Sequence, residues 1–189
     1  MIKYNESWFR GRRVLILGAT GFMGQYLVRA LERMGADITI LAHNQPVMEA
    51  LPDLKRIDSP RIRILQGDLC DPLLLLRLVA EQELIYGLAG KSGVVQSNKN
   101  PMHDLDINCR GLLNLLESCR MTNPSVRVVF PSSRLEYRKA ETLPVPETYP
   151  TEPRSIYGIH KVTGEKYLSL RSTLCPTNCD TAHHQSLRI

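Results

Sequence analysis

The stretch Val14-Leu15-Ile16-Leu17-Gly18-Ala19-Thr20-Gly21-Phe22-Met23-Gly24 joins an apolar run to three glycines spaced G-x-x-G-x-x-G. The apolar run predicts a buried strand, and the glycines predict a tight turn into a helix. The first N–H groups of a helix are unpaired, and the helix dipole adds positive charge there. A Cβ at the glycine positions would obstruct a phosphate or the contact between helix and strand. The stretch therefore predicts a site for the pyrophosphate of a dinucleotide.

Strand and helix patterns alternate along the rest of the chain. Strands are expected at Val14–Leu17, Ile38–Leu41, Ile62–Leu65, Leu84–Ala89 and Val126–Phe130, with the start of a sixth at Ser186–Ile189. Helices are expected around the stripe Leu27, Leu31 and Met34, which Gly35 ends, and at Leu73–Ala80 after the cap Asp71-Pro72, Met102–Cys119 and Ser155–Leu170. This order predicts the α/β class: a Rossmann-like, doubly wound parallel sheet with helices on both faces. Ligands should then bind beyond the carboxyl ends of the strands.

Composition predicts one globular domain. The chain has 189 residues, of which 43% are hydrophobic and 23% charged, which suits a single core of ordinary size. The net charge of +5 is spread along the chain without a basic patch, so we expect no nucleic-acid partner. The five cysteines are odd in number and unevenly spaced, which favours reduced thiols in the cytoplasm. No segment is apolar over a membrane-spanning length, so we expect no membrane association.

Tyr157 and Lys161 carry the predicted chemistry. Their spacing of four residues places both side chains on one face of the helix expected at 155–170. A phenol is a weak base at neutral pH, and a neighbouring ammonium should lower its pKa. Ser133, at the end of the fifth strand, is expected to offer a hydroxyl to the same substrate oxygen. The three residues form a candidate acid/base site.

Taken together, these motifs resemble the extended short-chain dehydrogenase/reductase family, in its NAD-dependent epimerase/dehydratase branch. The resemblance runs from about residue 12 to residue 170, and the run Arg154-Ser155-Ile156-Tyr157-Gly158 is similar to the one that carries the family's catalytic tyrosine. It implies Tyr157 as the acid/base, Lys161 as the group that tunes it and binds ribose, and Ser133 as their hydroxyl partner. The cofactor-binding residues that we expect, with Tyr157 and Lys161, are Gly18, Thr20, Gly21, Phe22, Met23, Gly24, His43, Asp68, Leu69, Leu88, Ala89 and Gly90.

The end of the second strand departs from the pattern of an NAD enzyme. An acidic residue is expected there to bind the ribose hydroxyls of adenosine, but the chain has Ala42-His43-Asn44. Asp37 lies at the other end of that strand. His43 could meet the 2′-phosphate of NADP, so the sequence leaves NAD and NADP open. The family continues into a smaller sugar-binding domain, and we expect residues 1–189 to be the cofactor domain without it.

These observations predict a nucleotide-sugar epimerase or dehydratase, most like a UDP-sugar 4-epimerase. The alternatives are an NADP-dependent sugar-nucleotide reductase and a catalytically silent dinucleotide-binding module or inactive fragment. Since the family pairs through the helix after strand four and the tyrosine helix, we expect a homodimer. Cys175, Cys179, His183 and His184 could in principle bind zinc, but their spacing is not that of a usual zinc module, and we expect no metal.

Overall fold

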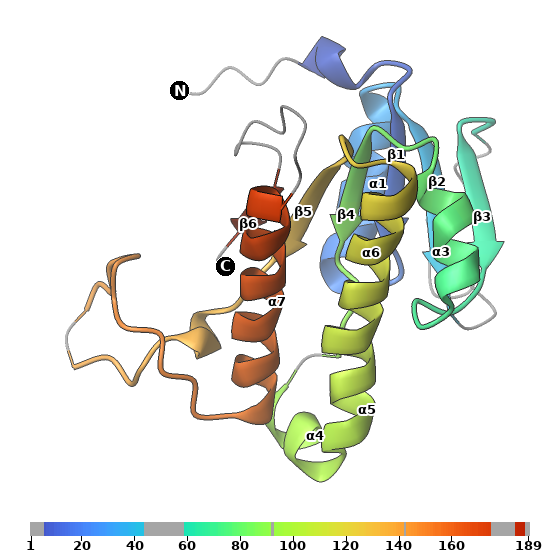
Figure 1. Ribbon diagram of the computed structural model, residues 1–189. Helices are drawn as coiled ribbons and strands as arrows, with labels where there is room; N and C mark the ends of the chain where they lie inside the picture. Colours follow the sequence, from blue (N-terminus) through green and yellow to red (C-terminus); the bar gives the residue numbers. More distant parts are fainter. Residues whose placement is uncertain (1–5, 44–58, 92, 142, 175–183, 188–189) are drawn as a thin grey trace.

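Six parallel strands form one sheet in the order β3-β2-β1-β4-β5-β6 (Figure 1). The computed structural model describes residues 6–43, 59–91, 93–141, 143–174 and 184–187. The strands are β1 (Arg13–Leu17), β2 (Asp37–Ala42), β3 (Ile62–Gln66), β4 (Leu84–Gly87), β5 (Arg127–Pro131) and β6 (His184–Leu187). This is the strand order of a Rossmann fold, and it confirms the predicted fold class.

The crossing point of the sheet lies between β1 and β4. Val14 of β1 stands opposite Ile38 of β2 on one side and Leu84 of β4 on the other. The chain moves outward from β1 to β3, then returns to β4 and moves outward in the other direction. Two crossovers therefore leave the carboxyl ends of β1 and β4 in opposite directions, which opens the crevice where such sheets bind ligands.

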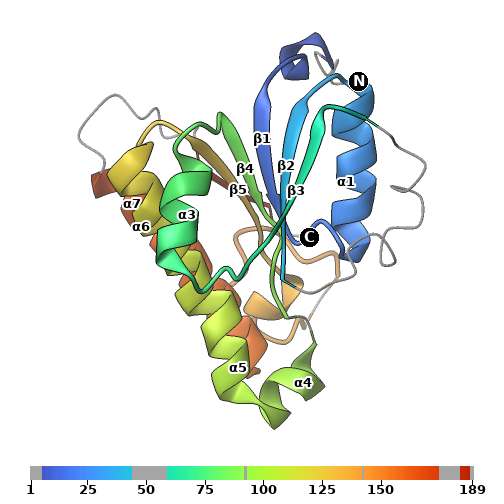
Figure 2. The same ribbon diagram turned by 90° about the vertical axis from the view of Figure 1, so that its right-hand side faces the viewer.

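Helices cover both faces of the sheet (Figure 2). Helix α1 (Phe22–Arg33) packs on one face, where Val28 and Leu31 join a core with Ile16 and Ile40. Opposite it lie α3 (Pro72–Val79), α6 (Leu112–Thr122) and α7 (Ile156–Leu174). Their apolar side chains surround Leu15, Ile85 and Val128 in a second core. Strands buried on both faces account for the continuous apolar runs in the sequence.

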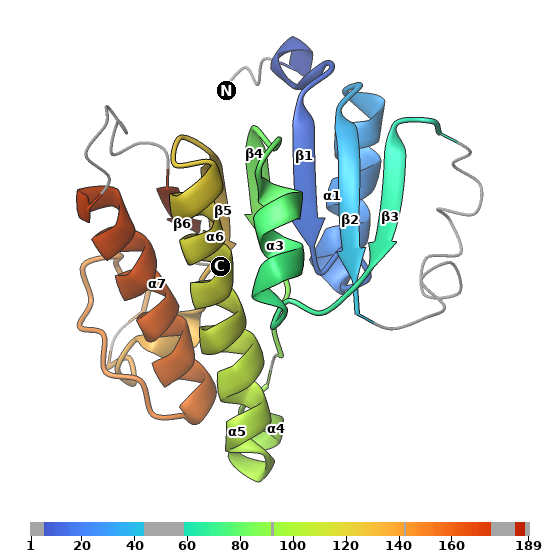
Figure 3. The same cartoon turned by 45° about the vertical axis from the view of Figure 1, so that its right-hand side comes forward.

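The helix predicted at Met102–Cys119 is not one continuous α-helix. It consists of α5 (Pro101–Leu105), a π-helical segment η3 (Asp106–Gly111) and α6. A short helix that the sequence analysis did not assign, α4 (Val94–Lys99), precedes it. Both α4 and α5 project past the carboxyl ends of the strands (Figure 3). The prediction was wrong here because apolar periodicity alone does not report a π turn.

Two helix boundaries follow the predicted chemistry. The carboxylate of Asp71 accepts hydrogen bonds from the N–H groups of Leu73 and Leu74, with Pro72 at the first helical position of α3. Gly35 follows α1 with a φ of +78°. Two other boundaries differ: β4 ends at Gly87 instead of Ala89, and β6 begins at His184.

The described part of residues 134–153 carries little regular structure. A short 3-10 helix, η4 (Arg134–Glu136), begins it, and a single antiparallel bridge joins Tyr137 to Thr151. Among the described helices, none is both long enough and apolar enough to cross a lipid bilayer.

Candidate cofactor cavity and acid/base cluster

The glycine turn brings the backbone of three elements together. Gly18 has a φ of +85°, and a Cβ built on it would lie 2.6 Å from the backbone nitrogen of Ala89. A Cβ on Gly24 would overlap the carbonyl oxygen of Gly18. Gly21 caps α1 without any side-chain hydrogen bond, and the first turn of the helix contains no acidic residue. The N-terminus of α1 is therefore open to an anion.

A cavity of about 540 Å³ opens beside this turn, at the carboxyl ends of the strands. Its walls come from β1, β2 and the segments that follow β3 and β4, with α5 and η3 closing one side. The lining residues are Leu17, Gly18, Thr20, Leu41, Ala42, His43, Gly67, Asp68, Leu69, Cys70, Ala89, Gly90, Lys91, His103, Asp106, Ile107 and Arg110. Its position matches the ligand crevice expected for this strand order.

One end of the cavity is polar. The carboxylate of Asp68 accepts a hydrogen bond of 2.8 Å from the backbone N–H of Cys70, and it lies 3.7 Å from Nδ1 of His43. Ala42, at the end of β2, is buried and lines the cavity. Asp37 is at the opposite end of the strand, paired with Arg61 at 2.7 Å. The acid missing from the end of β2 is thus not replaced by Asp37.

Lys161 lies in a second, largely buried cluster. Its amino group donates a hydrogen bond of 3.0 Å to the carbonyl oxygen of Pro131 and lies 4.4 Å from the centre of the Phe130 ring. Only 6% of the residue is exposed. Burial lowers the pKa of Lys161 to about 8, while the nearby carboxylates of Glu136 and Asp104 act to raise it.

Tyr157 and Ser133 complete this cluster, but the pKa of the phenol moves opposite to our expectation. Burial raises the pKa of Tyr157, and a hydrogen bond with Ser133 only partly offsets the shift. The expected effect of Lys161 is not seen because its amino group lies 5.8 Å from the centre of the tyrosine ring and is bonded to Pro131. In this conformation the phenol retains its proton at neutral pH.

The cavity and the cluster meet at Gly90. A Cβ built there would lie 2.6 Å from Oδ1 of Asn108 and 4.0 Å from the amino group of Lys161. Asn108 is buried in the π-helical segment, and its amide donates to the carbonyl oxygen of Lys91 at 3.1 Å. Gly90 therefore keeps the strand-four loop close enough for Lys161 to reach the edge of the cavity.

The predicted site residues fall into three groups. Around the cavity are Gly18, Thr20, His43, Asp68, Leu69, Ala89 and Gly90. At the start of α1 are Gly21, Phe22, Met23 and Gly24, with the Phe22 side chain largely exposed. Ser133, Tyr157 and Lys161 form the cluster beyond Gly90, while Leu88 packs against the core beneath α1 instead of lining the cavity.

Sequence reasoning missed several polar residues of the site. Cys70, His103, Asp106 and Arg110 line the cavity, and Glu136, Asp104 and His160 are buried near Lys161. The signal available for Asp104 and His160 was an ionisable residue at a helix position that periodicity assigns to the core, whereas Glu136 lies in the short 3-10 helix η4 and gave no such signal. Such residues are seldom buried without a partner.

No group of three His, Cys, Asp or Glu side chains among the described residues could hold a metal ion. Of the four residues weighed as zinc ligands, Cys175, Cys179 and His183 lie outside the described residues. The three described cysteines, Cys70, Cys109 and Cys119, are free thiols.

The strand order, the glycine turn and the cavity define the class of Rossmann-type dinucleotide-binding domains. Residues 14–172 match the family model described as the NAD dependent epimerase/dehydratase family. The chain belongs to this family, which confirms the resemblance noted from its motifs.

Known relatives share this segment. The chain is 35% identical over 164 residues to UDP-glucuronate 4-epimerase 1 of Arabidopsis thaliana, which covers 82% of this chain and 38% of the relative. It is 30% identical to a putative UDP-glucose 4-epimerase of Methanocaldococcus jannaschii, over 85% of this chain and 51% of the relative. A solved UDP-Glc/GlcNAc 4-epimerase from Campylobacter jejuni superposes with a TM-score of 0.83 at 26% identity, over 94% of this chain and 53% of that chain. The chain thus spans about two fifths to one half of the length of these proteins.

Proposed function

We propose that the chain provides the NAD-binding domain and the acid/base residues of a nucleotide-sugar epimerase, most like a UDP-sugar 4-epimerase. The observation that carries this proposal is the meeting of two features at Gly90. On one side is a cavity built around the glycine turn, and on the other is Lys161 with Tyr157 and Ser133. The 4-epimerase relatives support the same reaction class.

The residues present suit a dinucleotide. The open N-terminus of α1 would hold the pyrophosphate, and Asp68 and Leu69 would contact the adenine end. Lys161 would reach the ribose next to the nicotinamide. When bound, NAD supplies an acceptor for the hydrogen that leaves the sugar carbon.

In this proposal Tyr157 exchanges a proton with the sugar hydroxyl, and Ser133 holds the same oxygen by a hydrogen bond. Because burial raises the pKa of the phenol, proton removal by Tyr157 requires a closer cation than the described conformation provides. Lys161 is the cation nearest in this cluster, and a turn of its side chain from Pro131 toward Tyr157 would supply that charge.

The proposal is tested by calorimetric titration of the chain with NAD and NADP, followed by turnover assays with UDP-glucose and UDP-glucuronate. We expect NAD to bind with micromolar affinity, and Tyr157→Phe to retain that binding while turnover is lost. Because the chain spans about half of its relatives, turnover is assayed with the chain fused to the remaining part of a 4-epimerase relative, and NAD binding without turnover in that fusion would favour the silent binding module. Binding of neither cofactor would contradict the proposal.

We also propose that the protein is a homodimer that pairs through α6 and α7. The proposal is supported by a groove of about 90 Å³ between these helices, where Leu113 and Leu170 are 39% and 56% exposed. Exposed leucines that neighbour one another are typical of a surface that another chain covers. Sedimentation analysis should give twice the chain mass, and Leu170→Glu should reduce it to the monomer. A monomeric unchanged protein at high concentration would contradict this.

A further inference from the structure

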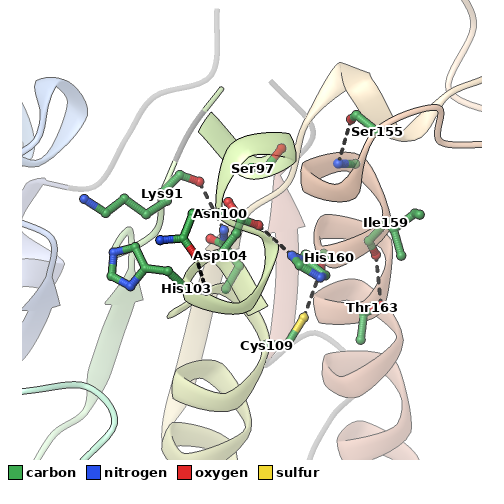
Figure 4. Close-up of polar contacts among 12 residues, drawn as sticks. Lys91, Ser97, Asn100, His103, Asp104, Cys109, Ser155, Ile159, His160 and Thr163 are labelled. Atoms are coloured by element: carbon green, nitrogen blue, oxygen red, sulfur yellow. Dashed lines mark hydrogen bonds and ion pairs between the residues drawn. The ribbon is translucent and has the colours of Figure 1, made fainter. Parts of the chain in front are cut away.

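Asp104 and His160 form a buried ionisable pair beside the acid/base cluster (Figure 4). Asp104 lies on α5 and His160 on α7, and Oδ2 of the carboxylate is 2.6 Å from Nδ1 of the imidazole. The residues are 2% and 8% exposed. At this distance the two groups share a strong hydrogen bond, and either would be costly to bury without the other.

The pair is next to Lys161, the residue that links the cluster to the cavity at Gly90. His160 immediately precedes Lys161 on α7, and its carbonyl oxygen accepts a long contact of 3.9 Å from the thiol of Cys109. The two partners of His160 come from adjoining segments, Asp104 from α5 and Cys109 from η3. These segments therefore contact the turn of α7 that presents Lys161, through one side-chain contact and one backbone contact.

The charge of Asp104 also reaches Lys161. The groups that act on the amino group are the carboxylates of Glu136, from η4, and Asp104, from α5, with the thiol of Cys109, from η3. Burial opposes the charged form of Lys161, whereas the two carboxylates favour it. The Cys109 thiol is neutral in the range where Lys161 titrates, because burial raises its pKa to about 11. Stability alone does not account for the Asp104–His160 pair, because well-packed apolar residues can often replace a buried ion pair without loss of stability.

We propose that Asp104 and His160 are positioning residues, which hold the turn of α7 that carries Lys161 and supply negative charge to the surroundings of its amino group. The His160 imidazole orients the carboxylate, and the carboxylate supplies the charge. This inference rests on the proposed role of Lys161 in the site.

The test is a direct titration of Lys161 by NMR in protein labelled in its lysine side chains, with the signal assigned from its loss in Lys161→Met. Asp104→Asn keeps the shape and removes the charge, so the midpoint of Lys161 should fall by roughly one pH unit. Asp104→Glu should restore it. The matched control is Glu117→Gln, an exposed carboxylate paired with Arg120 on α6, which should leave the midpoint unchanged.

A second variant guards against failure to fold. The double substitution Asp104→Leu with His160→Leu replaces the pair by apolar residues, and it should fold and show the same lowered midpoint. A midpoint that stays at the unchanged protein's value in both Asp104→Asn and the double variant would overturn the proposal.

NAD binding separates this inference from the proposed function. With Lys161 discharged, NAD should bind about fivefold more weakly to Asp104→Asn than to the unchanged chain at pH 8. If the midpoint falls but the unchanged chain binds no NAD, the pair sets the lysine charge and the proposed function is wrong. If NAD binds both proteins equally and the midpoint does not move, the pair has no positioning role.

Discussion

The amino group of Lys161, on α7, donates its hydrogen bond to the carbonyl oxygen of Pro131 at the end of β5. This contact joins the helix that carries Tyr157 and Lys161 to the carboxyl end of β5. The carbonyl offers a neutral acceptor to a cation that burial penalises, and the Phe130 ring adds an attractive face. Burying the charged amino group of Lys161 therefore costs free energy, and this cost should appear as a pH dependence of the stability of the fold.

Lys161→Met should reveal this cost as a pH dependence of stability. The pKa of Lys161 is about 8 in the folded protein and near 10.5 in the unfolded chain. Above pH 10.5 the amine is neutral in both states, and as the pH falls to 8 the unfolded chain takes up the proton first. The free energy of unfolding of the unchanged protein, relative to Lys161→Met, should thus fall by about 3 kcal/mol between pH 10.5 and pH 8, then level off.

Urea unfolding at several pH values measures this difference. Lys166→Met is the matched control, because Lys166 is exposed on the same helix. An equal pH dependence in both comparisons would contradict the assignment of the low pKa to Lys161.

Gly24→Ala should damage both folding and cofactor binding. Its Cβ would overlap the carbonyl of Gly18, which cannot move without opening the turn. We expect a loss of about 1–3 kcal/mol in the free energy of unfolding. Gly87→Ala is the control, since its Cβ would lie 3.7 Å from the nearest atom, at an ordinary contact distance. Denaturant unfolding compares the two, and equal losses would show that the close approach of Gly24 is not what matters.

Asp71→Ala should weaken α3 by removing its cap. The carboxylate accepts from two backbone N–H groups, so its loss leaves both without a protein partner and should cost about 1 kcal/mol. Asp71→Ser retains a capping oxygen and should recover most of this loss. Thermal unfolding followed by circular dichroism measures the stability of both variants. If Asp71→Ser is no more stable than Asp71→Ala, the capping role of Asp71 is contradicted.

Ala42→Asp should change the choice between NAD and NADP. An acid at the end of β2 can bind the ribose hydroxyls of adenosine and repels a 2′-phosphate. We expect NADP binding to weaken at least about tenfold while NAD binding is kept or improved. Ala42→Asn, which has the same shape without the charge, should show a much smaller effect. Calorimetric titration of each variant with NAD and with NADP measures this preference. An unchanged ratio of the two affinities in Ala42→Asp would mean that the adenosine ribose does not bind at the end of β2.

The parts of the fold that could be predicted from the sequence are those set by residues close together in the chain. The apolar runs of β1 and β2 are buried on both faces, and Asp71 and Gly35 mark helix ends through contacts within a few residues. These features need no knowledge of the rest of the chain. The division of one predicted helix into α5, η3 and α6 was missed, because apolar periodicity alone does not report a π turn.

The candidate site was predictable to the extent that its motifs are local. The glycine turn and the Tyr157–Lys161 spacing could be recognised in sequence, and both are at the ligand edge of the sheet. The prediction of a lowered pKa for Tyr157 was wrong, because the shift depends on where the Lys161 side chain points, which the sequence does not show. The pairing of Asp104 with His160 joins residues 56 apart in sequence, and only the packing of two helices brings them together.

The π-helical segment η3 sets the rotational phase between α6 and the residues before it. Each residue of an α-helix advances the chain by about 100° around the axis. Deleting one residue from 106–111, so that the segment closes into a regular α-helix, would rotate α5 by that angle relative to α6. Asp104 would then turn away from α7, although every side chain of the pair was still present. The length of this segment, as much as the identity of Asp104, brings a carboxylate to His160.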